Sequence, residues 1–449
     1  MSVRPITHHA SRQMPPRGST YRPVPPPAHQ QAQARSASDF WWLHPLAFLA
    51  LIGLVYASFI EFDFLRVVPK AYIPSWNYAW GGVLLLALAV GIGAMTAGRR
   101  PPALRASAAL DVPRWAMAVL LATTVFAYLV WFEPLLSDPK LLFGIVAGTR
   151  GNLRNSVSTT PGVTTMTQFG VAYVIAHAVL RGGGARRIEW WERAGLWLLV
   201  LLAAVRSVAW SERLAVIEMV LPYIVARLAF ARVRSAPLWQ LGSVLPMAAP
   251  VLLYGLFTGT EYFRSWEFYR DQYASIWQFS FERLVAYYAT ASNNGIGLLA
   301  ETRHWPEYSG RFVAEWLYLM PGVGEGLRLS VGDVQTAYVS FLERFARPEF
   351  NNPTGLFPIV FDIGYAGSAA YFLLAGALVG RLYDGWRRQA PAGVLFYPVS
   401  VIFLIELLRF NYFASTRFFP TALALAFVWL VTRRTLPRAA PLPMSRPSW

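Results

Sequence analysis

The chain has 449 residues, of which 55% are hydrophobic and 14% charged, and its formal net charge is +16. A mean hydropathy of +0.37 excludes an ordinary soluble protein, because a soluble surface of this size needs more charged residues. The lack of cysteine excludes disulfides, thiolate metal sites and a cysteine nucleophile.

The chain begins with a tail, residues 1–40, that is rich in Pro, Gln, Ser and Arg. A segment of this composition buries too little apolar surface to fold, so we predict a disordered cytoplasmic tail. It contains no apolar stretch of the kind that forms the core of a cleavable signal peptide.

Apolar runs of about 17–25 residues follow the tail, and this is the length that crosses a bilayer as a helix. They predict about ten transmembrane helices, at 43–60, 77–97, 114–132, 162–180, 194–208, 212–229, 241–258, 364–380, 392–408 and 418–432. We therefore expect an all-α fold, a polytopic integral membrane helix bundle with a large folded extracytoplasmic loop. Helices one to seven occupy 41–258, the loop occupies 259–360, helices eight to ten occupy 361–435, and a second cytoplasmic tail occupies 436–449.

The distribution of positive charge predicts the orientation of this bundle. The two tails and every second connecting segment together hold 23 of the 40 basic residues, against five acids. The rest of the chain holds 17 basic and 19 acidic residues, so the positive excess lies on one face. That face is expected to be cytoplasmic, with both termini on it. The basicity is thus explained by topology, and no nucleic acid is needed as a partner.

The loop 259–360 is dense in aromatic and charged residues, so we expect it to fold. Its segment "FERLVAYYATASNNGIGLLAE" (281–301) predicts an amphipathic helix that lies at the interface or dips into the membrane. His304 follows this segment, and a loop histidine can act as a general base near neutral pH or be purely structural. His177, inside the fourth predicted helix, is interpreted as a core residue with satisfied hydrogen bonds.

Three connections on the extracytoplasmic face carry paired arginines near the membrane boundary, among them "RSVAWSER" between the fifth and sixth predicted helices. The pairs are Arg206 with Arg213, Arg409 with Arg417, and Arg150 with Arg154. Long side chains at helix ends can reach the interface without having any function. Three pairs on the side where arginine is disfavoured instead predict a shared anion pocket, since a guanidinium group matches phosphate.

Acidic residues also fall within or near the predicted helices, where a buried acid is a functional candidate: Glu218, Glu406 and Asp362. Glu406 and Arg409 are three positions apart and could pair locally. Glu218 has no basic residue three or four positions away, so its partner should come from another helix. We predict that this partner is an arginine of the extracytoplasmic face.

One stretch, "EFNNPTGLFPIVFDIGYAGSAAYFLLAGALVGRLYDGW" (349–386), has an Asn-rich turn and then D-x-G-x-x-G entering a helix. Together with "RSVAWSERLAVIEMVLP" (206–222) and "TRGNLRNS" (149–156), it resembles the Wzy-type oligosaccharide repeat-unit polymerases. The order of helices and the position of the large loop over residues 40–435 are also similar to that family.

The resemblance implies a metal-independent membrane glycosyltransferase of the bacterial inner membrane, with no cofactor. It would transfer the growing glycan to an incoming repeat unit, with undecaprenyl pyrophosphate as the leaving group. Its catalytic residues would be Arg206, Arg213, Glu212 and His304, and its substrate-binding residues Arg150, Arg154, Arg409, Arg417, Glu218 and Asp362. Glu212 or His304 would take the proton of the acceptor hydroxyl. A carboxylate beside arginine should have a low pKa, which weakens Glu212 as that base. Membrane lipid, a chain-length regulator and a flippase of the same pathway are the implied partners.

Two other functions stay open at this stage. A ligase of the O-antigen type would use the same donor and a different lipid acceptor. A polysaccharide or lipid transporter would have inverted repeats and charges near the middle of the membrane. The sequence has no duplicated halves, and its charges gather at one face.

Overall fold

The computed structural model describes residues 35–61, 72–73, 76–97, 110–147, 150, 153, 160–183, 186–233, 235–302, 305–331, 334–346 and 350–435. This part of the chain is almost entirely helical. Its strands are two-residue segments, β1 (Arg35–Ser36) and β2 (Arg232–Val233), which pair antiparallel with Arg35 opposite Val233. The fold class is therefore all-α, as predicted.

A helix lies in each of the ten apolar runs. The first seven runs hold α1 (Pro45–Glu61), α2 (Trp76–Thr96), α3 (Arg114–Trp131), α6 (Phe169–Gly183), α7 (Trp190–Ala209), α8 (Leu214–Leu228), and α9 (Ala236–Val244) with α10 (Ala249–Glu261). The last three hold α16 (Phe357–Arg387), α17 (Pro391–Glu406) and α18 (Phe418–Thr435). Local apolar pattern was sufficient to place these helices because their backbone hydrogen bonds are made within each segment.

Four helical stretches in the described chain are long and apolar enough to cross a membrane: Trp76–Thr96, Arg114–Trp131, Ala236–Tyr269 and Phe357–Arg387. Shorter apolar helices cover Pro45–Leu54, Pro391–Glu406 and Phe418–Thr432. A polytopic membrane bundle is compatible with these helices, whereas the number of about ten crossings stays a prediction. The stretch Ala236–Tyr269 is the least buried of the four, since only 11% of its apolar 18-residue segment is buried inside the protein.

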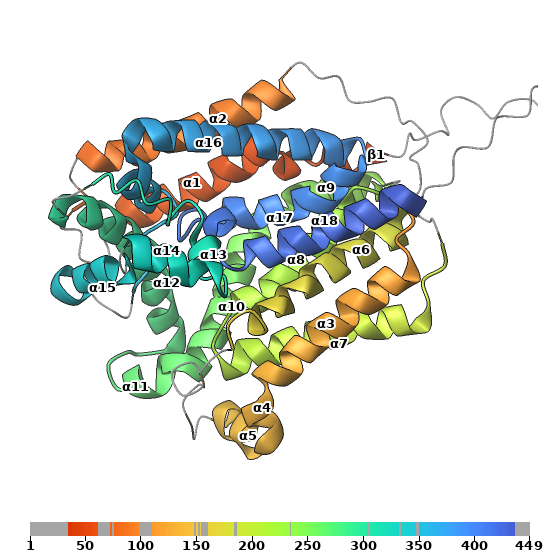
Figure 1. The fold of residues 1–449 in the computed structure, drawn as a ribbon, viewed down its shortest axis with the longest axis horizontal. Coiled ribbons are helices and arrows are strands. Elements are labelled where there is room, and N and C mark those ends of the chain that lie inside the picture. The colour runs from red at the N-terminus through yellow and green to blue at the C-terminus, as the bar shows by residue number, and fades with distance from the viewer. Residues whose placement is uncertain are drawn as a thin grey trace, which may run out of the picture.

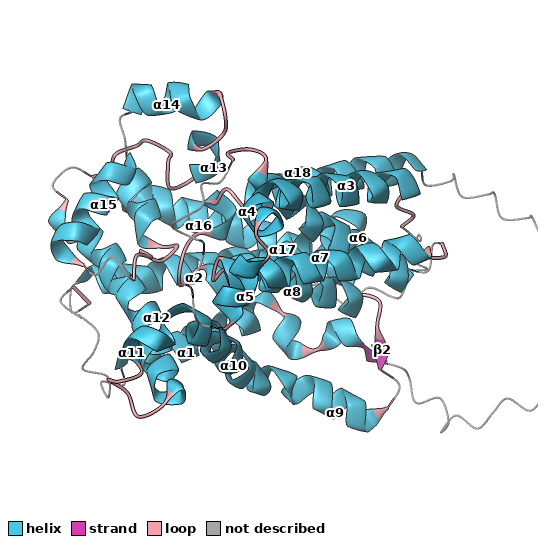
Figure 2. Cartoon of the chain, turned by 90° about the horizontal axis from the view of Figure 1, so that it is seen from below, coloured by secondary structure: helices cyan, strands magenta, loops and turns pink. Residues whose placement is uncertain are grey.

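The two ends of the bundle differ in what they contain. The large loop 259–360 folds into α11 (Glu267–Tyr269), α12 (Ile276–Glu301), α13 (Glu315–Tyr318), α14 (Val323–Val331) and α15 (Val334–Phe345). These helices gather at one end, while β1, α9 and the last turn of α18 lie at the other (Figures 1 and 2). The first and last described residues thus lie at the same end of the molecule. Two short helices, α4 (Glu133–Ser137) and α5 (Lys140–Val146), continue from α3.

Helix α12 is longer and more buried than its amphipathic pattern predicts. It begins at Ile276, and most of its residues are buried against other helices. Asn293 Oδ1 accepts a hydrogen bond from the backbone N–H of Tyr72 at 2.9 Å, and Asn294 Nδ2 donates to Phe350 O at 2.6 Å. The polar side chains of Asn293 and Asn294 therefore form hydrogen bonds with backbone groups of other segments, and they do not mark a solvent-exposed face of the helix.

Helices α2 and α16 lie side by side over much of their length (Figure 1). A Cβ atom built on Gly376 would lie 2.1 Å from Leu88 O, and one on Gly91 would lie 2.1 Å from Leu373 O. Gly376 and Gly380 form a G-x-x-x-G pattern, which allows close approach of membrane helices. Near its start α16 is kinked at Gly364, whose φ of 71° is in the left-handed region that favours glycine.

His177 is buried in α6, as predicted, and its ring packs 6.0 Å from that of Tyr223. The prediction that its hydrogen bonds are satisfied is wrong for the described structure. Neither ring nitrogen has a hydrogen-bond partner in the part of the chain that is described. Packing of α6 on α8 therefore decides its surroundings, and the sequence pattern could only indicate that it is buried.

Candidate functional site

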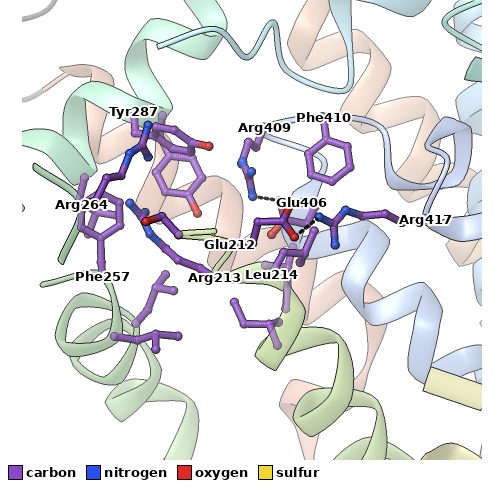
Figure 3. Close-up of a pocket in the computed structure, with 17 residues that line it drawn as sticks. Glu212, Arg213, Leu214, Phe257, Arg264, Tyr287, Glu406, Arg409, Phe410 and Arg417 are labelled. Carbon is purple, nitrogen blue, oxygen red and sulfur yellow. Dashed lines mark hydrogen bonds and ion pairs between the residues drawn. The ribbon is translucent and has the colours of Figure 1, made fainter. Parts of the chain in front are cut away.

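A pocket of about 150 Å³ lies where α8, α10, α12 and the connection between α17 and α18 meet. A cavity of this volume holds a group about the size of a benzene ring. Figure 3 shows Arg213, Arg264, Phe257 and Tyr287 on one side of it and Arg409, Glu406 and Arg417 on the other. The pocket thus joins residues from the two arginine-bearing connections with residues from the large loop.

Three of the predicted arginines, Arg213, Arg409 and Arg417, line this pocket. Arg213 and Glu212 are placed by the short connection between α7 and α8, where Ser211 adopts a left-handed φ of 53°. A non-glycine residue in that region is uncommon and strained, and here it reverses the chain between two helices. The convergence that the arginine pairs predict is therefore present for these three side chains.

Arg206 lies behind the pocket and does not line it. Its side chain is buried, with its guanidinium carbon 3.9 Å from the centre of the Trp131 ring. Its Nε donates to Glu212 Oε2 at 2.7 Å, and its Nη1 donates to Thr167 Oγ1 at 3.3 Å. Arg206 is thus connected to the pocket through Glu212, which makes it a supporting residue there.

Glu212 lies between two arginines. Besides Arg206, it accepts a hydrogen bond from Arg417 Nη2 at 3.0 Å. Arg417 Nη1 donates to Glu218 Oε2 at 2.9 Å, which confirms that an arginine from another helix is the partner of Glu218. Glu218 also accepts hydrogen bonds from Tyr412 Oη at 3.0 Å and from Gln168 Nε2 at 3.1 Å. The carboxylate of Glu218 is buried, yet its hydrogen bonds satisfy it.

On the other side, Glu261 holds the arginines in place without lining the pocket itself; it is a buried residue at the end of α10 that the sequence did not indicate. Glu261 forms ion pairs with Arg213, with Arg264 at 3.8 Å and with Arg283 of α12 at 2.9 Å. Arg264 lies on a single π-helical turn, Tyr262–Trp266, and such turns are frequent at functional sites. The sequence pattern that could have indicated this pair is a glutamate, Glu261, three positions before Arg264, just after an apolar run.

Aromatic rings cover the guanidinium groups on this side. The Arg213 guanidinium carbon lies 3.6 Å from the centre of the Phe257 ring and 5.8 Å from that of Tyr287. Arg409 approaches the same Tyr287 ring at 5.3 Å. Tyr287 therefore lies near both arginines, and the close stacking of Arg213 on Phe257 holds the planar guanidinium group of Arg213 in one orientation.

Glu406 and Arg409 form the local pair that their spacing allows, with Arg409 Nη1 2.8 Å from Glu406 Oε2. Both residues line the pocket. The whole cluster contains six arginines and four glutamates: Arg206, Arg213, Arg264, Arg283, Arg409 and Arg417, with Glu212, Glu218, Glu261 and Glu406. It therefore has an excess of two positive charges, and Glu261, which faces three arginines, lies where the excess is concentrated.

The arginines change the acidity of Glu212. Burial alone would raise its pKa, but the charges of Arg417 and Arg206 outweigh burial and lower the pKa to about 2. The prediction of a low pKa for Glu212 is therefore confirmed, and this carboxylate is a poor proton acceptor near neutral pH. Burial lowers the pKa of Arg213 to about 10, against the opposing effect of Glu261, so Arg213 stays charged at pH 7.

Asp362 lies elsewhere and binds the chain itself. Its side chain is buried in α16 and accepts hydrogen bonds from Gly310 N at 2.7 Å, Phe312 N at 2.9 Å and Val313 N at 3.2 Å. Ser309 Oγ donates a further one at 3.0 Å. These donors occupy the carboxylate, so Asp362 fixes the segment 309–313 and is not among the residues that line the pocket.

Three predicted residues remain: Arg150, Arg154 and His304. Arg150 is exposed and is not among the residues that line it. Arg154 and His304 lie outside the described residues. The predicted Arg213, Arg409, Arg417, Glu212 and Glu406 line the pocket, and the predicted Arg206 and Glu218 are paired with them. Arg264, Tyr287 and Glu261 extend the predicted site.

Comparisons of the chain with protein-family models, with curated proteins and with solved structures gave no match.

Proposed function

We propose that the protein transfers a glycan from an undecaprenyl-pyrophosphate-linked oligosaccharide to a hydroxyl group of an incoming lipid-linked repeat unit. This polymerase reaction takes place at the outer face of the bacterial inner membrane. The observation that supports it most is that Arg213, Arg409 and Arg417 line one pocket together with Arg264. These side chains come from three separate connections and gather at the end of the bundle that carries the large loop.

The charge of the cluster suits a diphosphate. A diphosphate diester carries two negative charges, which would balance the two excess positive charges of the arginine cluster. Guanidinium groups bind phosphate oxygens through paired, charge-assisted hydrogen bonds, and these are stronger than neutral ones. Because negative charge grows on the leaving diphosphate during glycosyl transfer, arginines that are already in position lower the barrier.

The rest of the pocket suits a lipid-linked substrate. Its apolar lining comes from α8, α10, α12 and α17: Leu214, Ile217, Leu253, Leu256, Leu284 and Ile405. Leu253 and Leu256 belong to the stretch that is least covered by the rest of the protein. The diphosphate would lie against the arginines in the pocket, and the lipid would leave it along the partly exposed Leu253 and Leu256.

The reaction needs few participants. The acceptor hydroxyl oxygen forms a bond to the anomeric carbon of the donor sugar, and the bond from that carbon to the phosphate oxygen breaks. The electron pair of the broken bond leaves with undecaprenyl pyrophosphate, and the hydroxyl proton passes to a base. The sugar–phosphate bond supplies the free energy, so no nucleotide takes part.

Deletion of the gene in its native host tests this function. We expect single lipid-linked repeat units to accumulate and long surface or secreted glycan to disappear from a gel. Normal chain lengths in the deletion strain would contradict the proposal. If polymer persists on its lipid carrier but fails to reach another lipid, the protein is a ligase. If repeat units accumulate on the cytoplasmic face, it is a transporter.

A further inference from the structure

Glu406 differs from the other three carboxylates of the cluster in how it is held. Among the described residues, its carboxylate accepts one side-chain hydrogen bond, from Arg409 to Oε2. Glu212 is bound by two arginines, and Glu261 is bound by three. Glu218 does not line the pocket and is bound by an arginine, a tyrosine and a glutamine. Glu406 is therefore the pocket carboxylate that the loss of one ion pair would release.

Arg409 is suited to leave that pair when an anion arrives. It lines the pocket, and its Nε has no hydrogen-bond partner among the described residues. The Tyr287 and Phe410 rings lie 5.3 and 5.2 Å from its guanidinium carbon, so the group has aromatic surface to turn against. A phosphate oxygen competes with the Glu406 carboxylate for the same donors, and it can accept two parallel hydrogen bonds from one guanidinium.

We propose that Glu406 is the base that accepts the proton of the acceptor hydroxyl, and that donor binding activates it by drawing Arg409 onto the diphosphate. This inference depends on the proposed function and names the base for the same pocket. The hydroxyl proton moves to a Glu406 carboxylate oxygen as the oxygen bonds to the anomeric carbon, and the diphosphate leaves with the electron pair. A free carboxylate is a stronger base than one paired with arginine, so the base becomes active when the donor is in place.

This arrangement couples the base to the donor. With no donor bound, Glu406 is paired with Arg409. With the donor bound, the released carboxylate lies in the same small pocket as the bond that breaks. Transfer is therefore expected to require the donor before the base becomes competent.

The test uses the full-length protein in lipid nanodiscs with a synthetic undecaprenyl-pyrophosphate-linked repeat unit as substrate. Glu406→Gln should lower turnover by roughly 10²–10⁴-fold, the usual contribution of general base catalysis. The same variant should bind undecaprenyl pyrophosphate tighter, by about tenfold, because Arg409 no longer leaves a charged partner. Glu406→Asp should restore part of the turnover and keep the decline of rate at acid pH, which Glu406→Gln should lose.

Glu267→Gln is the matched control, since Glu267 pairs with Arg270 at an exposed position away from the pocket. It should leave both turnover and binding unchanged. Full turnover of Glu406→Gln with an unchanged pH profile would overturn the role of Glu406 and leave the polymerase proposal standing. Loss of both binding and turnover, with no recovery in Glu406→Asp, would also overturn it, because that is the result of a structural role. A wild-type protein that forms no polymer would overturn the proposed function itself.

Discussion

Arg417 Nη1 donates a hydrogen bond to Glu218 Oε2 at 2.9 Å, although the two residues are 199 positions apart in the chain. The bond joins α8 to the connection that precedes α18. The same guanidinium group reaches Glu212 through its other nitrogen, at 3.0 Å. Arg417 thus fixes two carboxylates at the base of the pocket, and several predictions about stability and activity depend on this network.

The buried pair of Glu218 and Arg417 should be important for stability. Replacing Glu218 by Leu leaves Arg417 with only the partly exposed Glu212 as a partner, and it leaves Tyr412 and Gln168 without their buried acceptor. Removing one partner from a buried ion pair costs about 3–5 kcal/mol in comparable cases. We expect a clear fall in the thermal unfolding temperature of the protein in detergent. The double variant Glu218→Leu with Arg417→Leu should recover much of the loss, because no unpaired charge remains. If the two single losses simply add, the pair is not coupled.

Arg213 should not be replaceable by lysine. Lysine keeps the charge, but it loses the planar group that lies 3.6 Å over the Phe257 ring and pairs with Glu261. We expect Arg213→Lys and Arg213→Ala each to reduce polymer formation by at least about tenfold while the protein remains in the membrane. Glycan gels and a membrane blot measure these two quantities. Arg270→Lys, at an exposed position, is the control. Wild-type activity of Arg213→Lys would exclude paired binding of phosphate.

The stability contribution of Glu212 should depend on pH in a defined window. Its pKa in the folded protein is lowered to about 2, whereas an unperturbed glutamate has a pKa near 4.5, so the native state favours the charged form. The contribution is fully present above about pH 5 and is lost as pH falls towards 2. The difference in unfolding temperature between wild type and Glu212→Gln should therefore be constant from pH 8 to 5 and shrink below. A difference that changes between pH 8 and 5 would contradict the low pKa.

Asp362→Asn should release the segment 309–313 and leave the residues that line the pocket in place. The amide replaces one oxygen by a donor that now faces the N–H groups of Phe312 and Val313. Arg311, which is buried in the native fold, should become accessible to trypsin, and cleavage after it should accelerate by about tenfold or more. Asp271→Asn, at a highly exposed site, should leave the rate unchanged. Equal protection in Asp362→Asn would mean that other contacts hold the segment.

Sequence alone located the helices and three of the four arginines that line the pocket, but it could not assign the other members of the pocket. Arg206 and Arg213 both lie beside the short connection between α7 and α8, yet one is buried behind Glu212 and the other lines the cavity. Asp362 has the appearance of a buried functional acid, and its four donors come from a loop whose path the sequence does not indicate.

By itself, the sequence determined an all-α chain, the positions of its apolar helices, and the need of Glu218 for an arginine from another helix. These follow from local hydrogen bonding, from the length of each apolar run and from the cost of an unpaired buried charge. The tertiary structure alone decided that Glu261 gathers three arginines, that α12 is buried, and that Glu406 faces the pocket. The reason is that these contacts depend on which faces of the helices pack together. That packing is decided by residues far apart in the chain, which local sequence patterns do not describe.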